Sequence, residues 1–142
     1  MLKVEEHGDK VMSDLQQANI IQILPAVRRT ATGSVADIDI QDYEGPCQLI
    51  LTSSAGGGTT PTLDVTLHHA TSSGGSYAAV SAGVFTQLTD AADVTSMIAL
   101  NCSDLRRFVK GTATISGTSP TFDCSLVLVA RKKAGRNASQ VV

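Results

Sequence analysis

A ten-residue motif occurs twice in this chain, at residues 58–67 and at residues 117–126, with six of ten positions identical at a constant offset of 59. Both copies run from glycine through two hydroxyl residues to proline, and then alternate apolar with polar side chains. Because proline has a fixed φ angle and no N–H donor, it fits the first position of a strand. We interpret the two copies as matched β-hairpins of a two-sheet Greek-key sandwich or jelly roll.

Period-two patterns in the rest of the chain also predict an all-β fold. In residues 35–41 apolar and polar side chains alternate, which places Ile38 and Ile40 on one face of a half-buried strand. Seven more segments combine β-favouring residues with flanking turn residues. They are residues 47–53, 63–69, 77–80, 84–88, 94–101, 106–115 and 121–131. The expected fold class is therefore a jelly-roll or Greek-key β-sandwich of about eight strands.

The N-terminal residues predict a different structure. Residues 9–19 place apolar side chains at helical spacing, so a short amphipathic helix is expected there. The apolar run 20–24 favours β-structure and is expected to end at Pro25. The expected division of the chain is an N-terminal arm or short helix at residues 1–30, a β-sandwich domain at 31–131 and a basic C-terminal tail at 132–142.

Charge and hydropathy limit the partners that the chain can have. Its 142 residues have a formal net charge of −2, and 17% of them are charged. Such a chain lacks the positive field that nucleic-acid binding requires, and its apolar runs are far shorter than the ~18 residues of a membrane span. The acidic N-terminus offers no export signal. We therefore expect neither a nucleic-acid nor a membrane partner, and we expect synthesis in a cytoplasm.

Residue types that perform catalysis or bind metals form no recognisable arrangement. None of the three cysteines lies at metal-ligand spacing from another, so buried thiols are expected. His68 and His69 are adjacent in an expected strand, so their side chains leave opposite faces and do not converge on one metal. Asp64 and Asp123 occupy equivalent places in the repeat, which favours a shared structural role. We expect no catalytic residue, no cofactor and no metal, and hence no enzyme.

Several strand and turn motifs together resemble small virion proteins of tailed bacteriophages. The segments that carry the resemblance are residues 44–45, 58–65 with His68, 85–88, 107–109 and 117–122. The resemblance implies a jelly-roll-like sandwich that works as a capsid cement or decoration subunit. It also implies a place on the capsid surface of the virion, the major capsid protein as partner, and self-association as a homodimer or homotrimer.

Candidate contact residues for such a partner lie at the two ends of the expected sandwich. The last twelve residues hold four basic and no acidic side chains, whereas residues 1–130 hold 7 basic and 13 acidic ones. The tail can therefore contact an acidic surface of a neighbouring subunit, or it can simply be solvated. The predicted partner interface consists of Ile20, Ile21, Ile23, Arg28, Arg29, Arg131, Lys132 and Lys133.

Two other functions stay open at this point. A binding module of a tail or host-attachment structure would contact its receptor through the Gly/Ser-rich loops at residues 54–60 and 71–76. An enzyme would need a convergent acid, base or metal site, for which Asp64 and His68 are the residues to test. The number of copies in a particle distinguishes a shell subunit from a tail module.

Overall fold

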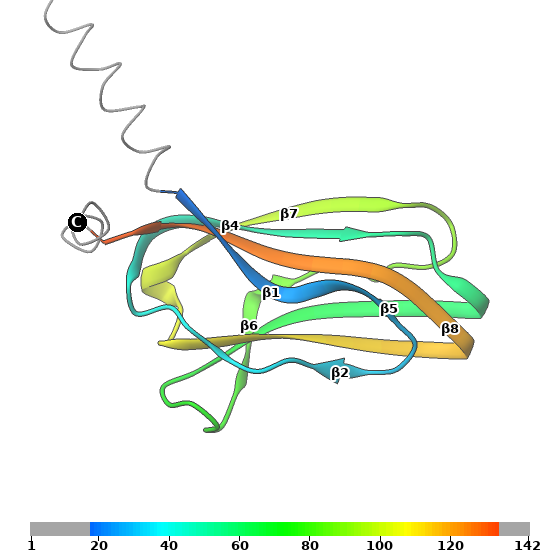
Figure 1. The fold of residues 1–142 in the computed structure, drawn as a ribbon, viewed down its shortest axis with the longest axis horizontal. Coiled ribbons are helices and arrows are strands. Elements are labelled where there is room, and N and C mark those ends of the chain that lie inside the picture. The colour runs from blue at the N-terminus through cyan, green and yellow to red at the C-terminus, as the bar shows by residue number, and fades with distance from the viewer. Residues whose placement is uncertain (1–17, 134–142) are drawn as a thin grey trace, which may run out of the picture.

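The computed structural model describes residues 18–133 and is almost entirely β-structure in this range (Figure 1). Eight strands and one 3-10 turn follow one another along the chain. They are β1 (Ala18–Arg29), β2 (Gly33–Ser34), β3 (Ile38–Asp39), β4 (Tyr43–Ser53), β5 (Gly57–Ala70), β6 (Ala78–Val84), β7 (Val94–Asn101), η1 (Cys102–Asp104) and β8 (Phe108–Lys132). The expected fold class, an all-β jelly-roll or sandwich of about eight strands, is confirmed.

The 25-residue strand β8 organises the molecule. On one side it pairs antiparallel with β1 and then with β2 and β3, and on the other side with β4 and then β5. β7 extends the β4 side, and β6 extends the β5 side. β8 is therefore shared by two sheets. Sheet A has the order β1-β8-β4-β7, and sheet B has the order β2/β3-β8-β5-β6.

The two sheets join at a corner formed by the two copies of the repeated motif. Thr59 lies opposite its own equivalent in the second copy, Thr118. On either side, the pair 57/121 and the pair 62/116 consist of equivalent positions, because 57 and 116, and 62 and 121, differ by the same offset of 59. In each copy the glycine and the residue before proline have positive φ angles, 98° and 48° in the first copy and 121° and 50° in the second. A Cβ on Gly58 would lie 2.5 Å from the Ser119 carbonyl oxygen, and one on Gly117 would lie 2.8 Å from a carbonyl oxygen of the first copy. The corner therefore has approximate two-fold symmetry.

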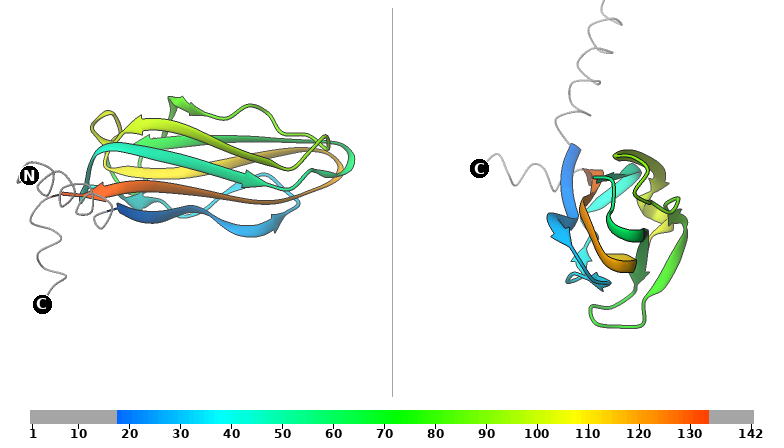
Figure 2. Two further views of the ribbon diagram at one scale, coloured as in Figure 1. Left: turned by 90° about the horizontal axis from the view of Figure 1, so that it is seen from above. Right: turned by 90° about the vertical axis from the view of Figure 1, so that its right-hand side faces the viewer.

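The prediction of two matched hairpins is wrong, because the two copies pair with each other. β4 and β5 both pair with β8, and the strands expected at residues 106–115 and 121–131 are the two halves of β8. The ribbon turns at the end opposite to the start of β1 and the end of β8, as the left view of Figure 2 shows. A sharp bend in a paired ribbon needs backbone conformations that glycine adopts without strain, which explains the glycines of the motif.

Side chains from the inner faces of both sheets form one core. Before the corner the buried positions of β8 are odd-numbered, from Val109 to Ile115, and after it they are even-numbered, from Phe122 to Ala130. This change of phase lets one strand line the core from both sheets. The right view of Figure 2 shows the strands enclosing this core. Phe122 is the largest of the fully buried side chains and lies at the corner.

β1 continues through Pro25, where the sequence predicted its end. Its register against β8 shifts between Gln22 and Leu24 and again between Leu24 and Val27. Each shift is a bulge with one extra residue, and the second contains Pro25, on an edge strand where a missing N–H is tolerated. The described part of the expected arm, Ala18–Arg29, is thus a strand of sheet A.

Other expected segments differ in detail. The strand expected at residues 35–41 is paired only at Ile38–Asp39, and β6 ends at Val84, after which Leu88 forms an isolated bridge with Leu63. The helix expected at residues 9–19 lies outside the described residues, except that Ala18 and Asn19 belong to β1.

Candidate interaction surfaces

The three isoleucines of the predicted interface lie in β1 but have different surroundings. Ile20 is 75% exposed, whereas Ile21 is half-buried against the core. Ile23 is fully buried on the same face as Ile21, and the bulge beside it turns Leu24 inward as well. Ile23 therefore does not belong in the predicted partner interface, because a core side chain does not reach a partner.

The predicted arginine pair is engaged at the corner end of β1. Arg28 donates from Nε and Nη2 to both carboxylate oxygens of Asp123 on β8, at 2.9 and 3.0 Å. This hydrogen-bonded ion pair holds the pKa of Asp123 below its usual value, although both side chains are more than half exposed. Arg29 donates to the Pro25 carbonyl at 3.2 Å and lies back along its own strand. Of the two, Arg28 is the one available to a partner.

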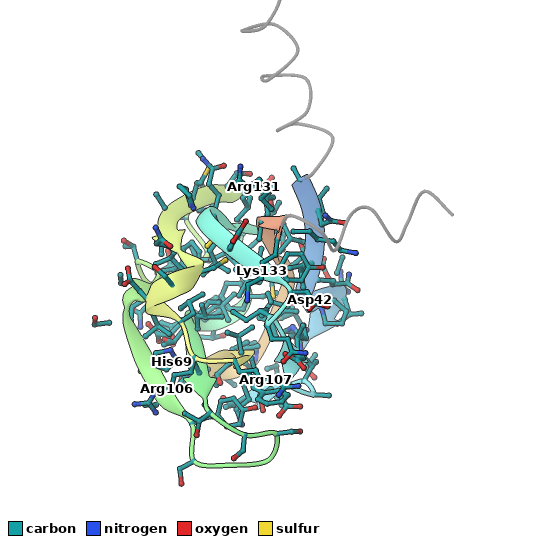
Figure 3. The ribbon with its side chains drawn as sticks, turned by 90° about the vertical axis from the view of Figure 1, so that its left-hand side faces the viewer. Asp42, His69, Arg106, Arg107, Arg131 and Lys133 are labelled. Carbon is teal, nitrogen blue, oxygen red and sulfur yellow. The ribbon has the colours of Figure 1, made fainter. Side chains whose placement is uncertain are left out.

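The basic residues at the end of β8 lie where the described chain begins and ends (Figure 3). The Arg131 guanidinium is 3.8 Å from a Glu44 carboxylate oxygen. The Lys133 N–H donates to the Asp42 carbonyl at 2.8 Å, so the turn before β4 holds this end of the described chain. Lys132 is the last residue of β8 and is half-buried.

A hollow of about 260 Å³ opens at this same end of the sandwich. At its rim Arg107 donates to Asp39 at 2.7 Å and lies 5.0 Å from the centre of the Phe108 ring. The hydrogen bond from Arg107 holds the pKa of Asp39 below its usual value. The lining holds three basic side chains and one acidic one, Glu44, and Arg107 is paired with Asp39, so the charge around the hollow is mixed. The residues that line it include Ile40, Tyr43, Glu44, Cys102, Leu105, Arg106, Arg107 and Lys133.

A hydrogen-bond network anchors the loop between β5 and β6. The Asp37 carboxylate accepts hydrogen bonds from the Tyr77 hydroxyl, from the Gly74 N–H at 3.1 Å and from the Ser73 hydroxyl at 3.2 Å. These bonds lower the pKa of Asp37, while desolvation and the aspartate raise the pKa of Tyr77 to about 12. The ammonium group of Lys110 lies 4.2 Å from the centre of the Tyr77 ring. The loop at residues 71–77 is thus tied to the body of the domain.

The histidines and aspartates that could support chemistry have separate structural partners. His69 Nδ1 accepts the Arg106 N–H at 3.1 Å, and His68 Nδ1 lies 3.3 Å from the Thr112 hydroxyl. Desolvation lowers the pKa of His69. Asp64 accepts a side-chain amide at 2.9 Å. Over residues 18–133 no group of three histidine, cysteine, aspartate or glutamate side chains is arranged to hold a metal.

The three cysteines are buried free thiols, as the sequence predicted. Cys47 in β4 and Cys102 in η1 share a hydrogen bond, which together with burial raises the pKa of the Cys47 thiol. Burial also raises the pKa of Cys124. Because thiolates are the reactive form of cysteine, these two buried thiols are poor nucleophiles.

An apolar surface that was not predicted from the sequence lies on the outside of sheet A. Adjacent strands place Ile20 opposite Val129, and Val127 opposite Ile50, which in turn lies opposite Met97. These side chains point away from the core, because their neighbours along each strand are the buried ones. We call this surface the outer apolar strip. Its apolar members are Ile20, Ile50, Met97, Ala99, Val127 and Val129, and the uncharged polar residues Gln22 and Gln48 lie among them.

A sequence signal for the outer apolar strip existed. Residues 49–51 and 126–130 are uninterrupted apolar runs, where a strand with one solvated face shows clean alternation. Such runs predict strands that are covered on both faces. In sheet A the inner face lies on the core, whereas no described residue covers the outer face.

The arrangement of the sheets has counterparts among viral capsid proteins. The crystal structure of the infectious bursal disease virus VP2 subviral particle matches with a TM-score of 0.55 and 14% sequence identity over 83% of this chain. A structure of the Gx strain of the same virus matches with a TM-score of 0.51 and 14% identity, again over 83% of this chain. The chain spans about a third of each of these proteins, 33% and 32%. At this identity the likeness establishes a shared capsid-type β fold, and it is not specific to tailed-bacteriophage cement proteins.

Other comparisons add no relative. A scan against protein-family models and a search of curated proteins found no match. Among the described residues, no helix has the length and apolar character needed to span a membrane.

Proposed function

We propose that this chain is a structural, non-enzymatic protein of a virion. The observation that carries the proposal is the bent, shared ribbon with its two sheets, which infectious bursal disease virus VP2 matches over 83% of this chain. A fold alone hosts many functions, so the surfaces of the molecule must also fit the role. Three of them are suited to contacts with other subunits: the exposed edge strands, the outer apolar strip and the terminal end of mixed charge.

Within this role we propose a cement or decoration subunit that binds the major capsid protein on the outside of the shell. Supporting features are a small sandwich pinned at its corner and two exposed cation-bearing ends, one at Arg28 and one at Arg131 to Lys133. Each such contact is weak in isolation, because exposed ion pairs contribute less than about 1 kcal/mol. On a shell, many identical contacts act together, so avidity gives firm binding.

The test is the copy number of the chain in purified particles. Quantitative mass spectrometry and immunogold labelling of virions from the source of this sequence should find the chain in hundreds of copies spread over the shell. Shells assembled without it should come apart at a lower temperature, and adding the purified chain should restore the difference. Absence from the particles contradicts a virion role.

A tail or host-attachment module is the second candidate. The loop at residues 71–77 favours it, because this loop projects beyond the sheets (Figure 1) and is held in one conformation by Asp37. An ordered projecting loop is a common way to present binding residues on a rigid scaffold. A handful of copies at one vertex or along a tail, in the same labelling experiment, would favour this candidate over a shell subunit.

A further inference from the structure

The outer apolar strip is not a requirement of the fold, as sheet B demonstrates. On the outside of sheet B the first half of β8 has Lys110, Thr112 and Thr114, which lie opposite His68, Thr66 and Asp64 of β5. On the outside of sheet A the second half of the same strand has valine at positions 127 and 129. Threonine has nearly the same shape as valine and an equally good β-propensity. The valines therefore point to a covered surface.

The surroundings of the strip indicate what covers it. Along β8 the strip is bounded at one end by Arg131 with Glu44, 3.8 Å apart, and at the other end by Asp123 with Arg28, 2.9 Å apart. Each end thus holds one cation and one anion, and the side chains of the strip between them are uncharged. Turning such a surface by 180° about an axis across the strands exchanges the two ends of β8, so Arg131 of each copy lies opposite Asp123 of the other.

We propose that the outer apolar strip is the contact surface for a second copy of this chain, packed face to face about a two-fold axis that lies perpendicular to the strands. Arg131 of one copy then faces Asp123 of the other at both ends of the contact, and Glu44 in β4 and Arg28 in β1 flank these pairs on opposite sides of β8. A two-fold contact uses the same patch on both copies, so its two charged ends must be complementary to each other. This contact would join copies of the proposed virion subunit, so the inference rests on the proposed function. It can nevertheless be tested on the purified chain in solution, without virus particles.

The size of the strip sets the expected strength of this contact. From residue 123 to residue 131 a strand extends about 26 Å, and four strands span about 19 Å with their side chains. The contact therefore buries about 500 Å² on each copy, or about 1,000 Å² in total, which is at the lower end of specific interfaces. We expect a dimer that dissociates in the micromolar range in solution and is reinforced where many copies are held side by side.

The symmetry predicts which residues meet. Positions 127, 50 and 97 form a row across the sheet, midway between the charged ends, and this row lies on the two-fold axis. Met97, which is 59% exposed on the edge strand β7, therefore faces Met97 of the other copy. Packed sheets are about 10 Å apart, which is too far for a disulfide without movement but within reach of a short bis-maleimide crosslinker.

The experiment uses the full chain at near-physiological salt. Sedimentation velocity from low micromolar to about 1 mM should reveal a monomer–dimer equilibrium, and Met97→Lys should weaken it by about tenfold or more. Val84→Lys is the matched control, because Val84 is an equally exposed apolar residue, 54%, on the edge strand of sheet B. Met97→Cys should crosslink to a dimer with the bis-maleimide, and Val84→Cys should not.

Three outcomes overturn the proposal. One is a chain that stays monomeric over the whole concentration range. Another is a dimer that Met97→Lys and Val84→Lys weaken equally. The third is a monomer that associates only after deletion of residues 1–17, because the N-terminal segment of the same chain would then be the cover. A dimer that behaves as expected, in a chain that is absent from particles, supports this inference while it removes the proposed function.

Discussion

The two halves of β8 show one strand with two different outer surfaces. Both halves alternate strictly, and both contribute buried side chains to the same core. Outward, the half in sheet B has Lys110, Thr112 and Thr114, whereas the half in sheet A has Val127 and Val129. The inner residues form the core in both halves. The polarity of the outer residues can therefore differ according to whether solvent or another surface covers each sheet.

This difference separates the residues that determine folding from those that determine association. Inner positions must be apolar wherever a sheet covers the core, so their pattern says nothing about partners. An apolar outer position is informative, because solvent favours a polar residue there. Substitutions can test this separation, and the largest loss of stability is expected at inner positions.

The largest effect is expected from an inner position of sheet A. Leu126 is fully buried, so Leu126→Ala should lower the free energy of unfolding by about 2–5 kcal/mol. Its neighbour Val127 points outward, so Val127→Thr should lower the same quantity by less than about 1 kcal/mol. Urea unfolding followed by circular dichroism measures both at a concentration where the chain is monomeric. Equal losses would show that the outer residues of sheet A also hold the fold.

The corner that joins the two sheets should be the next most sensitive place. Gly117→Ala puts a Cβ 2.8 Å from a carbonyl oxygen at a φ angle of 121°, and Gly58→Ala does the equivalent on the other copy of the motif. We expect each to cost about 2–3 kcal/mol of stability, and to cost similar amounts because the corner is nearly symmetric. Gly33→Ala is the control, since no atom lies within 4 Å of a Cβ at that position. A loss of the same size in the control would contradict this account of the corner.

Exchanging the outer residues of the two halves sharpens the comparison further. Thr112→Val with Thr114→Val gives sheet B the outer surface of sheet A, and stability should change by less than about 1 kcal/mol. Because valine at both positions creates a new exposed apolar patch, we expect additional self-association in sedimentation experiments. The reverse exchange, Val127→Thr with Val129→Thr, should leave the chain folded and monomeric. A folded reverse variant that still forms the dimer would place the contact elsewhere.

The sequence predicted the fold class because local patterns determine it. The strand patterns located β4, β5 and β7, and alternation placed Ile38 and Ile40 on one inward face. The sequence could not predict that the two copies of the motif pair with each other, because register between segments 59 residues apart depends on tertiary packing. The bulge between Gln22 and Leu24 likewise could not be predicted, and it turns Leu24 inward beside Ile23 because a bulge shifts the phase of the alternation.

The candidate surfaces were less predictable than the fold. Clusters of basic residues are visible in a sequence, so Arg28 and Arg131 could be proposed, and the structure gives each an acidic partner across the strands. The outer apolar strip is different, because its members come from four strands. Only the register brings Ile20, Ile50, Met97 and Val127 onto one surface.

The smallest effect concerns the loop anchored on sheet B. Hydrogen bonds from Tyr77 and from the Gly74 N–H lower the pKa of Asp37 relative to an unfolded chain. A lowered pKa in the folded state stabilises the loop fully above the usual aspartate pKa of about 4, and this contribution is lost as the pH falls through the lower, folded value. Hydrogen exchange of residues 71–77 should therefore speed up below about pH 4 relative to the intrinsic rate, while that of β7 should not.

Asp37→Asn separates this anchoring from general acid unfolding. The variant should exchange quickly in residues 71–77 already at neutral pH, because a neutral amide replaces a carboxylate that accepts three hydrogen bonds. Asp123→Asn serves as the matched variant on sheet A, since its ion pair with Arg28 borders the outer apolar strip and does not touch the loop. If Asp123→Asn loosened the loop as well, the two outer surfaces would be coupled through the core and could not be treated as independent.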